Sequence, residues 1–407
     1  MTRDLSPRRS RAGAVWIARA AGLALAACAL APRSAWGQAR PRSFVSHGFL
    51  TGGGQATTGV PEARPYFLGW NARIDPPEEL GAFETPLEPG GVAADPRTGW
   101  VYVATRHGRV VCLDGGKVRW SVEVGASILA PPTVWQDSVV VGTGQGVLAV
   151  LNKVTGARRV RAILGDQLIT KPVVVEQQNG PAIALVGSSQ DTLYAVELQY
   201  AQKLWTAHRD QPAPFTVYGF ARPVVLHDSV FIGFADGTVE ARDLTTGAQK
   251  WAQTISPSGS LVDVDALGTD GHLVYATSYS GGVYALQPAD GAALWRTPMS
   301  GAARLLVDGP RVIAVAPGVM QSLRASDGKV EWRFTFGHRI AETPAATQGV
   351  VVLAQNGGPV YFVDEHTGTP LGLFMSGSGT DSPPAMNGQI LFALTNGGRL
   401  YSMAVVP

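Results

Sequence analysis

The chain has 407 residues, of which 49 are glycine and 28 are proline, and only 16% are charged. This density of turn-forming residues argues against an all-helical protein, and the 45% of hydrophobic residues argues against global disorder. The net charge of +2 comes from the arginine-rich residues 1–27. The remainder is mildly acidic and so lacks the positive charge typical of nucleic-acid-binding proteins.

Residues 1–39 have the features of an export signal. An arginine-rich start precedes the apolar run 20–31, which is too short to span a bilayer as a permanent helix. Two processing alternatives remain open. A Leu-Ala-Ala-Cys sequence ending at Cys28 fits the lipobox of bacterial lipoproteins, in which the cysteine thiol is acylated, whereas residues 37–39 fit an ordinary cleavage site that would discard Cys28.

Residues 29–67 are rich in glycine and proline and show no apolar period, so we expect a flexible tether. The only other cysteine, Cys112, lies in the apolar run Val-Val-Cys-Leu. This position predicts a buried, unreactive thiol, and the mature chain is expected to have no disulfide.

An eightfold repeat organises residues 68–407. A strand that follows a turn recurs eight times, starting at Gly108, Gly146, Asp191, Gly237, Gly281, Gly318, Gly358 and Gly398. Each copy follows an apolar strand, and a third strand, often opened by a proline, comes before that one. Four strands every ~40–45 residues are typical of a propeller blade. The sequence therefore predicts an all-β protein, an eight-bladed β-propeller of four-stranded blades.

A fourth strand in most copies starts at a tryptophan four residues after a glycine, as in Gly116 and Trp120. The glycine supplies a turn conformation that other residues resist, and we expect the indole to fill the wedge between neighbouring blades. Val160 and Gly372 stand in the place of this tryptophan in two copies.

The eighth copy ends at Pro407, before its outer strand would begin. The segment Trp70–Ile74 is a tryptophan-led strand with no blade of its own. We predict that this N-terminal strand pairs with the C-terminal strands and closes the ring, which removes the open edge between the first and last blades.

The turn at residues 241–251, Ala-Arg-Asp-Leu-Thr-Thr-Gly-Ala-Gln-Lys-Trp, resembles the repeat signature of the pyrroloquinoline-quinone-type propellers. Within that superfamily, residues 68–407 most resemble the propeller lipoprotein of the bacterial β-barrel assembly machinery. The similarity is sharpest at Leu-Val-Asp-Val-Asp (261–265) and at Gly-Arg-Leu-Tyr-Ser (398–402).

The resemblance implies a non-enzymatic scaffold of the outer-membrane β-barrel assembly complex. Such a protein binds the periplasmic domains of the barrel-forming subunit, and unfolded outer-membrane protein clients are further expected partners. It would face the periplasm from a lipid anchor on the outer membrane if Cys28 is retained, and would be soluble in the periplasm if Cys28 is removed.

The resemblance also implies partner-binding residues. These are Asp263 and Asp265, together with an earlier loop that carries Phe215, Val217 and Tyr218, where tyrosine replaces an arginine common in the family. In an extended segment the two carboxylates would share one side. We expect them to be exposed, either as an acidic clamp for a partner's cation or simply as two solvated residues, so that reversing both charges should leave the melting temperature nearly unchanged.

Glu342 and Asp381 fall in equivalent loops before later blades and could add to an acidic rim on the same face. We predict no catalytic residues, no cofactor and no metal site, because the histidines lack ligand spacing and the two aspartates lack the further oxygens that calcium needs. Two alternatives remain. One is a periplasmic quinone-type propeller enzyme or small-ligand binder that uses the central channel, and the other is an envelope interaction module for another partner.

Overall fold

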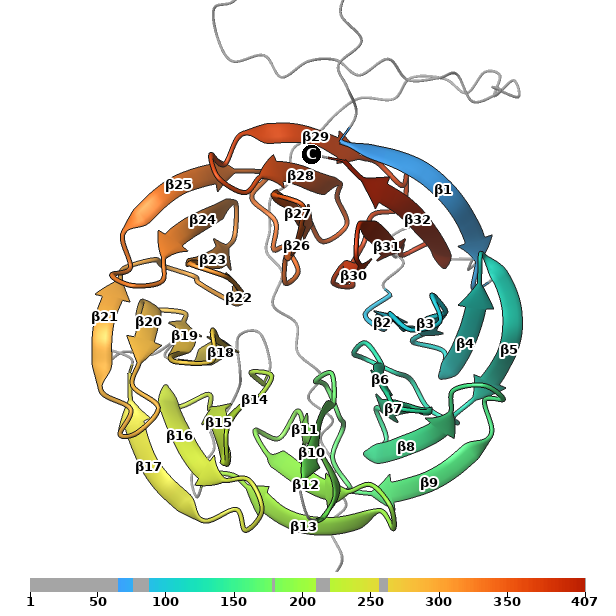
Figure 1. The fold of residues 1–407 in the computed structure, drawn as a ribbon, viewed down its shortest axis with the longest axis horizontal. Coiled ribbons are helices and arrows are strands. Elements are labelled where there is room, and N and C mark those ends of the chain that lie inside the picture. The colour runs from blue at the N-terminus through green and yellow to red at the C-terminus, as the bar shows by residue number, and fades with distance from the viewer. Residues whose placement is uncertain (1–64, 76–87, 178–179, 210–219, 256–262, 407) are drawn as a thin grey trace, which may run out of the picture. The chain divides into compact units, whose positions relative to one another are not determined.

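A computed structural model describes residues 65–75, 88–177, 180–209, 220–255 and 263–406. All of them belong to one compact unit, Glu62–Pro407. Within these residues the strands form eight four-stranded antiparallel sheets, which are arranged as blades around a ring (Figure 1). The predicted all-β, eight-bladed propeller is therefore confirmed. The described part of the chain has no helix that is long and apolar enough to cross a membrane.

The first four blades follow one another along the chain. Blade 1 comprises β2 (Gly91–Ala94), β3 (Val101–Ala104), β4 (Arg109–Asp114) and β5 (Lys117–Glu123). Blade 2 comprises β6 (Thr133–Trp135), β7 (Ser138–Gly142), β8 (Val147–Asn152) and β9 (Arg158–Ile163). Blade 3 comprises β10 (Val173–Gln177), β11 (Gly180–Gly187), β12 (Leu193–Glu197) and β13 (Gln202–Ala207). Blade 4 comprises β14 (Val224–Leu226), β15 (Ser229–Gly233), β16 (Thr238–Asp243) and β17 (Gln249–Thr254).

The last four blades complete the ring. Blade 5 comprises β18 (Val264–Thr269), β19 (Val274–Ser278), β20 (Gly282–Leu286) and β21 (Ala293–Thr297). Blade 6 comprises β22 (Arg304–Asp308), β23 (Arg311–Ala316), β24 (Val319–Arg324) and β25 (Val330–Thr335). Blade 7 comprises β26 (Ala345–Thr347), β27 (Val350–Ala354), β28 (Val360–Asp364) and β29 (Pro370–Phe374). Blade 8 comprises β30 (Ala385–Asn387), β31 (Ile390–Leu394), β32 (Arg399–Val405) and β1 (Tyr66–Arg73).

The hydrophobic core lies between the faces of neighbouring blades. The middle strands are apolar on both faces, and β7 and β12, for example, are buried along their whole length. Val140 of blade 2 and Val186 of blade 3 belong to one buried cluster, because the sheet of each blade packs against the next. The outermost strands, such as β17, expose most of their side chains to solvent. Each blade therefore depends on its two neighbours for its burial.

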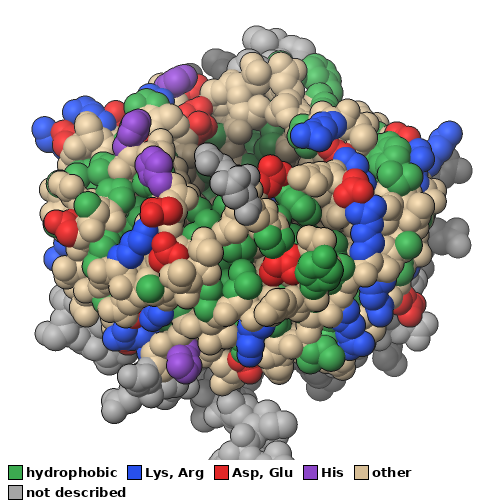
Figure 2. Space-filling view, turned by 60° about the horizontal axis from the view of Figure 1, so that its bottom comes forward, with side chains coloured by type: hydrophobic (Ala, Val, Ile, Leu, Met, Phe, Trp, Pro, Cys, Tyr) green, Lys and Arg blue, Asp and Glu red, His purple; other side chains and the backbone are tan. Residues whose placement is uncertain are grey.

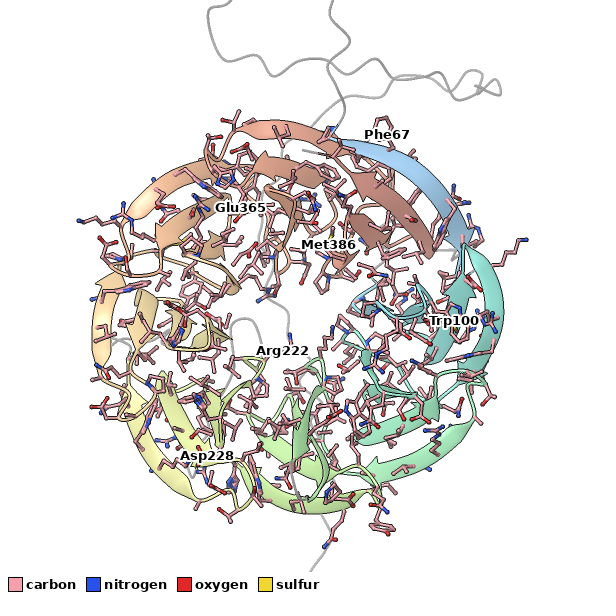
Figure 3. The ribbon with its side chains drawn as sticks, in the orientation of Figure 1. Phe67, Trp100, Arg222, Asp228, Glu365 and Met386 are labelled. Atoms are coloured by element: carbon pink, nitrogen blue, oxygen red, sulfur yellow. The ribbon has the colours of Figure 1, made fainter. Side chains whose placement is uncertain are left out.

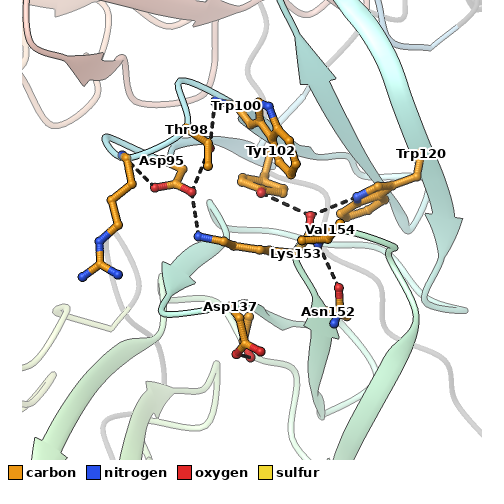
Figure 4. A network of polar contacts seen from close by, with 11 residues as sticks. Asp95, Thr98, Trp100, Tyr102, Trp120, Asp137, Asn152, Lys153 and Val154 are labelled. Carbon is orange, nitrogen blue, oxygen red and sulfur yellow. Dashed lines mark hydrogen bonds and ion pairs between the residues drawn. The ribbon is translucent and has the colours of Figure 1, made fainter.

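The outer-strand tryptophans join one blade to the next. Trp120 of blade 1 donates a hydrogen bond from Nε1 to the carbonyl oxygen of Lys153 in blade 2, at 3.0 Å, and Tyr102 donates to the same oxygen at 3.2 Å (Figure 4). The ring of Trp120 lies against Gly156, whose φ is +74°, and a Cβ there would come within 2.7 Å of the indole. Glycine is thus required both for the turn and for the close approach of the ring.

The same arrangement recurs around the ring. The other outer-strand indoles that donate to a carbonyl of the following blade, at 2.7–3.0 Å, are those of Trp205, Trp251, Trp295 and Trp332. The prediction that the indoles fill the wedges between blades is confirmed, with the addition that each indole packs on the glycine of the next repeat rather than on that of its own.

In the two copies without this tryptophan, the residues that face its position from the next blade also differ. Val160 of blade 2 packs in the same cluster as Ala201 of blade 3, and Ala201 stands where the glycine would be. At Gly372 of blade 7, a Cβ would come within 2.9 Å of Pro65, which leads into β1. The next residue, Tyr66, stacks on Phe362 with 4.9 Å between the ring centroids.

The N-terminal strand closes the ring. The strand β1 pairs antiparallel with β32, from Tyr66 opposite Val405 to Arg73 opposite Arg399, with a bulge between Leu68 and Asn71. It begins at Tyr66, so the last residues assigned to the tether are part of a strand. Trp70 packs against Phe392 of the same blade, with 5.9 Å between the ring centroids, and against Gly116 of blade 1.

Of the two cysteines, only Cys112 lies within the described residues. Cys112 lies in β4 with none of its surface exposed, and burial raises the pKa of its thiol to about 11, as expected for an unreactive side chain. Cys28, the rest of the export signal and the tether up to residue 64 lie outside the described residues.

A candidate interaction site beside the central channel

Asp263 and Asp265 are buried, with 3% and 6% of their surface exposed. The segment that carries them is held between two blades: Val264 N donates to Phe234 O of blade 4 at 3.1 Å, and Tyr279 N of blade 5 donates to Asp263 O at 3.2 Å. The expectation of two exposed carboxylates is therefore wrong. The expected tolerance of charge reversal loses its premise, and we now expect Asp263→Arg or Asp265→Arg to lower the melting temperature, because an arginine at either position would have to be buried or would displace the segment.

The two carboxylates nevertheless influence each other. The pairing of β18 with β19 shifts register between Val264 and Ala266, so the regular alternation of the strand is interrupted beside Asp265. The charge of Asp263 is one of the causes that raise the pKa of Asp265. The sequence spacing thus correctly placed two acidic groups close together, although not in solvent.

Asp265 lines the central channel of the ring and is the least satisfied of these groups. Neither of its carboxylate oxygens has a hydrogen-bond partner in the described part of the chain. Burial, followed by the charge of Asp263, raises its pKa to about 8, while Arg304 acts in the opposite direction. Most molecules therefore carry a proton on Asp265 at neutral pH, and a cation that reached it would favour the ionised form.

Two further acids, Asp191 of blade 3 and Asp236 of blade 4, complete this site. Asp191, in the turn between β11 and β12, is buried, and both of its carboxylate oxygens accept from Ala235 N at 3.3 Å. Burial raises its pKa to about 6, and the charges of Asp236 and Asp263 act in the same direction. We refer to Asp191, Asp236, Asp263 and Asp265 as the acidic cluster. It joins blades 3, 4 and 5.

Asp191 was missed in the sequence, although a signal was present. The third repeat begins with Asp191 where the other seven begin with glycine, and its φ of +54° is the left-handed conformation that glycine adopts there. Aspartate tolerates this conformation better than most residues, but at a cost. A carboxylate that replaces a turn glycine in one copy of a repeat could therefore have been selected from the sequence as a candidate position.

One arginine offsets part of the acidic charge. Arg209 contacts Asp236 at 2.8 Å and Glu240 at 2.6 Å, and its guanidinium lies 5.8 Å from the ring centroid of Phe234. Arg209 is shared between Asp236 and Glu240, which lies outside the cluster, and the charge of a second arginine, Arg304, acts on Asp265. A site with such an excess of acidic groups suits a guanidinium or ammonium group, which could donate to several oxygens at once.

Glu342 and Asp381 lie with Asp265 along the same channel, as their repeat positions predicted. They are more satisfied than Asp265: Glu342 lies 4.0 Å from Arg304, and Asp381 accepts from Asn396 Nδ2 at 2.8 Å and from Gly357 N at 2.9 Å. Burial raises the pKa of both. Figure 2 shows acidic side chains around the hollow in the middle of the visible face.

Phe215, Val217 and Tyr218 lie outside the described residues, which stop at Arg209 and resume at Phe220. Both described ends of this loop lie beside the acidic cluster. Arg209 contacts Asp236, and Phe220 packs edge-on against Phe234, with 6.1 Å between the ring centroids. The described residues on either side of positions 210–219 therefore lie beside Asp236 and Phe234 of blade 4.

Among the residues that the structure describes, no three His, Cys, Asp or Glu side chains are arranged to hold a metal ion. Cys112 is packed inside blade 1, among the residues of its core cluster, and does not line the channel.

Comparison with known proteins gives a consistent picture. The family model described as outer membrane protein assembly factor BamB matches residues 69–159, 131–285 and 279–405. A relative of that name from Legionella pneumophila is 29% identical over 206 residues, which are 48% of this chain and 54% of the relative. Another from Yersinia pestis is 24% identical over 326 residues, 74% of this chain and 81% of the relative.

Solved structures share the fold. The crystal structure of BamB from Moraxella catarrhalis superposes with a TM-score of 0.72 at 20% identity, covering 83% of this chain and 99% of that one. The quinohemoprotein alcohol dehydrogenase from Comamonas testosteroni superposes with a TM-score of 0.67 at 12% identity, covering 85% of this chain and 78% of the enzyme. At these identities the likeness concerns the propeller alone.

Proposed function

Because the chain belongs to the outer membrane protein assembly factor BamB family, we propose that it is a non-enzymatic scaffold for the assembly of outer-membrane β-barrel proteins. In this proposal the acidic cluster binds the periplasmic domains of the barrel-forming subunit of the assembly complex. The protein acts from the periplasmic face of the outer membrane, and unfolded clients are further partners.

The carboxylate of Asp265 is the observation that carries the proposal. A buried acidic group without a hydrogen-bond partner is costly to the isolated chain. An arginine or lysine of a partner would supply the missing donors and a compensating charge, so the free energy that the folded chain loses at Asp265 would be recovered on binding.

Phe215, Val217 and Tyr218 supply the apolar part of the same surface in this proposal. Their loop begins at Arg209 and ends at Phe220, both beside the acidic cluster. Aromatic and apolar side chains next to a few desolvated charges are the usual composition of an interface centre. The tyrosine at position 218, where the family commonly has arginine, favours an aromatic contact over an additional ion pair.

We expect Asp265→Asn to weaken capture of the barrel-forming subunit. Asparagine preserves the volume of the side chain but cannot carry the charge that a partner's cation would meet. Loss of one interfacial ion pair costs ~2–5 kcal/mol, which corresponds to roughly 30-fold or more in affinity. The measurement is binding of the mature chain to the detergent-solubilised subunit, with and without its periplasmic domains.

Glu123→Gln is the matched control for this experiment, because Glu123 is an exposed acid on the outer strand β5, far from the acidic cluster. It should bind as the wild type does. Full capture by a folded Asp263→Asn, Asp265→Asn double variant would remove this face from the proposal.

Anchoring at the membrane rests on Cys28. If the lipobox is used, Cys28→Ala should abolish labelling with radioactive palmitate and move the protein from the membrane fraction to the soluble periplasm. The fold should be unaffected, because the substitution lies outside the propeller. An unlabelled wild type whose mature N-terminus is Gln38 or Arg40 would instead establish ordinary cleavage.

A further inference from the structure

The channel at the centre of the ring is a second candidate site. It has a volume of about 880 Å³ and is lined by inner strands, and the segments before them, from all eight blades. Pockets of this size hold small molecules in many proteins. The assembly role proposed above assigns no ligand to it.

Charges are distributed unevenly around this channel. Lys171, just before β10, and Arg222, just before β14, bring two cations from the adjacent blades 3 and 4. The acidic side chains Asp265, Glu342 and Asp381 come from blades 5, 7 and 8, and Arg304 of blade 6 lies on the same side of the channel. Figure 3 shows Arg222 at the middle of the ring, next to the inner end of blade 4.

Lys171 and Arg222 are not neutralised by the described part of the protein. No hydrogen bond or ion pair joins either side chain to another residue in the described ranges, whereas Arg304 on the opposite side has Glu342 at 4.0 Å. Lys171 is half-buried, and Arg222 is exposed to the solvent of the channel. Desolvation by the surrounding protein, followed by the charge of Arg222, lowers the pKa of Lys171 to about 8. The folded chain thus holds two like charges together at an electrostatic cost, which an anion between them would offset.

The walls beside these cations are apolar. Ile169 and Phe220 line the channel in the same two blades, and Leu129 and Ala130 line it from blade 2. A bare inorganic ion would leave these surfaces in contact with water. A ligand with an apolar body would bury them while its charged group met the lysine and the arginine.

We propose that the side of the channel formed by blades 3 and 4 binds a small organic anion, a carboxylate or a phosphate on an apolar body, with Lys171 and Arg222 as its counter-charges. Arginine offers a planar pair of donors that fits either head group, and lysine adds a second point charge. This site uses other charged residues than the proposed partner surface, although Asp265 of the acidic cluster lines the same channel.

Two fluorescent probes, 2-naphthoate and 2-naphthyl phosphate, test the proposal by titration calorimetry on the mature chain. We expect one molecule of at least one probe to bind per chain, and the preferred probe identifies the head group. Lys171→Met and Arg222→Met should each weaken binding about tenfold, as expected for the loss of one charged contact. The double variant should bind no probe.

Controls separate the charge from the fold and from simple hydrophobicity. The double variant should melt no lower than the wild type and should still capture the barrel-forming subunit, so loss of probe binding would not reflect misfolding or loss of the partner surface. Lys117→Met, on the exposed strand β5, should bind like the wild type. Equal binding of the neutral 2-naphthylmethanol, equal binding of inorganic phosphate, or unchanged binding by the double variant would each overturn the proposal.

Discussion

A chain that lacks residues 29–80 is expected to have a melting temperature about 10 °C below that of the intact mature protein. A chain that lacks only residues 29–60 should have the same melting temperature as the intact protein. The first deletion removes β1, and with it the ladder to β32, the stacking of Tyr66 on Phe362 and the packing of Trp70 on Phe392. Loss of one buried aromatic side chain alone costs roughly 3–5 kcal/mol. The second deletion ends before the described strand begins.

Thermal unfolding followed by circular dichroism measures this difference. Trp70→Ala in the full mature chain is an intermediate case, because it removes one ring and keeps the strand, so its melting temperature should fall between those of the two truncations. Equal melting temperatures for both truncations would show that β1 does not close the ring in solution. The longer truncation should also associate at lower concentration, since β32 would present an unpaired edge.

Asp265→Asn is expected to make the propeller more resistant to unfolding at alkaline pH. The unfolded chain releases the proton of this carboxyl near its ordinary pKa of 3.8, whereas the folded chain keeps it up to about pH 8. Between these values the folded state binds more protons than the unfolded state, so the free energy of unfolding of the wild type falls as pH rises. Asparagine has no proton to lose, and this contribution to the slope disappears.

The two proteins should therefore differ little near pH 4 and increasingly up to about pH 8.5, where the variant should melt higher by on the order of 5 °C. Buried Glu88 and Asp191, with pKa values raised to about 7 and about 6, add to the slope of both proteins and cancel in the difference. Glu123→Gln, on the surface of β5, should show no such trend. A constant difference between Asp265→Asn and the wild type over this pH range would contradict the burial of an unpartnered carboxyl.

The blades could be predicted because their determinants are local in the sequence. A turn glycine, an alternating strand and a tryptophan four residues after a glycine all lie within one repeat, so the count of repeats gives the count of blades. The partner of each indole could not be predicted in the same way. Trp120 packs on Gly156 of the following repeat, and that contact depends on how two blades face each other.

The burial of Asp263 and Asp265 escaped prediction for the same reason. Exposure at these positions is set by the turns of two neighbouring blades, at Phe234 and at Tyr279, and by an irregular register in β18. A loop that looks polar and open in the sequence is closed by residues from other strands and turns. The mutual influence of the two carboxylates depends only on their spacing, and that much was predicted.

The two channel cations occupy the same position in two neighbouring repeats of the sequence. Lys171 and Arg222 each stand immediately before a proline that leads into an innermost strand, Pro172 and Pro223. Equivalent positions of a repeat have equivalent places in a propeller, so two cations at one repeat position are expected to lie on the same side of neighbouring blades. The structure shows that this side is the channel. A comparison of equivalent positions across the aligned repeats would have identified this pair of cations.

The seam between blades 2 and 3 differs mechanically from the rest of the ring. Outer-strand indoles or, at the junction of blades 7 and 8, Tyr66 bridge the other junctions in the described residues. Between blades 2 and 3, Val160 and Ala201 stand in place of the indole and its glycine, and the indole that crosses this junction, Trp135, lies on the innermost strand β6 and donates to Glu176 at 3.0 Å. Because the outer strand β9 lacks the bridging indole, we expect its amide hydrogens to exchange with solvent earlier than those of the other outer strands. Lys171 belongs to blade 3. If blades 2 and 3 moved apart, the channel would therefore widen directly beside Lys171.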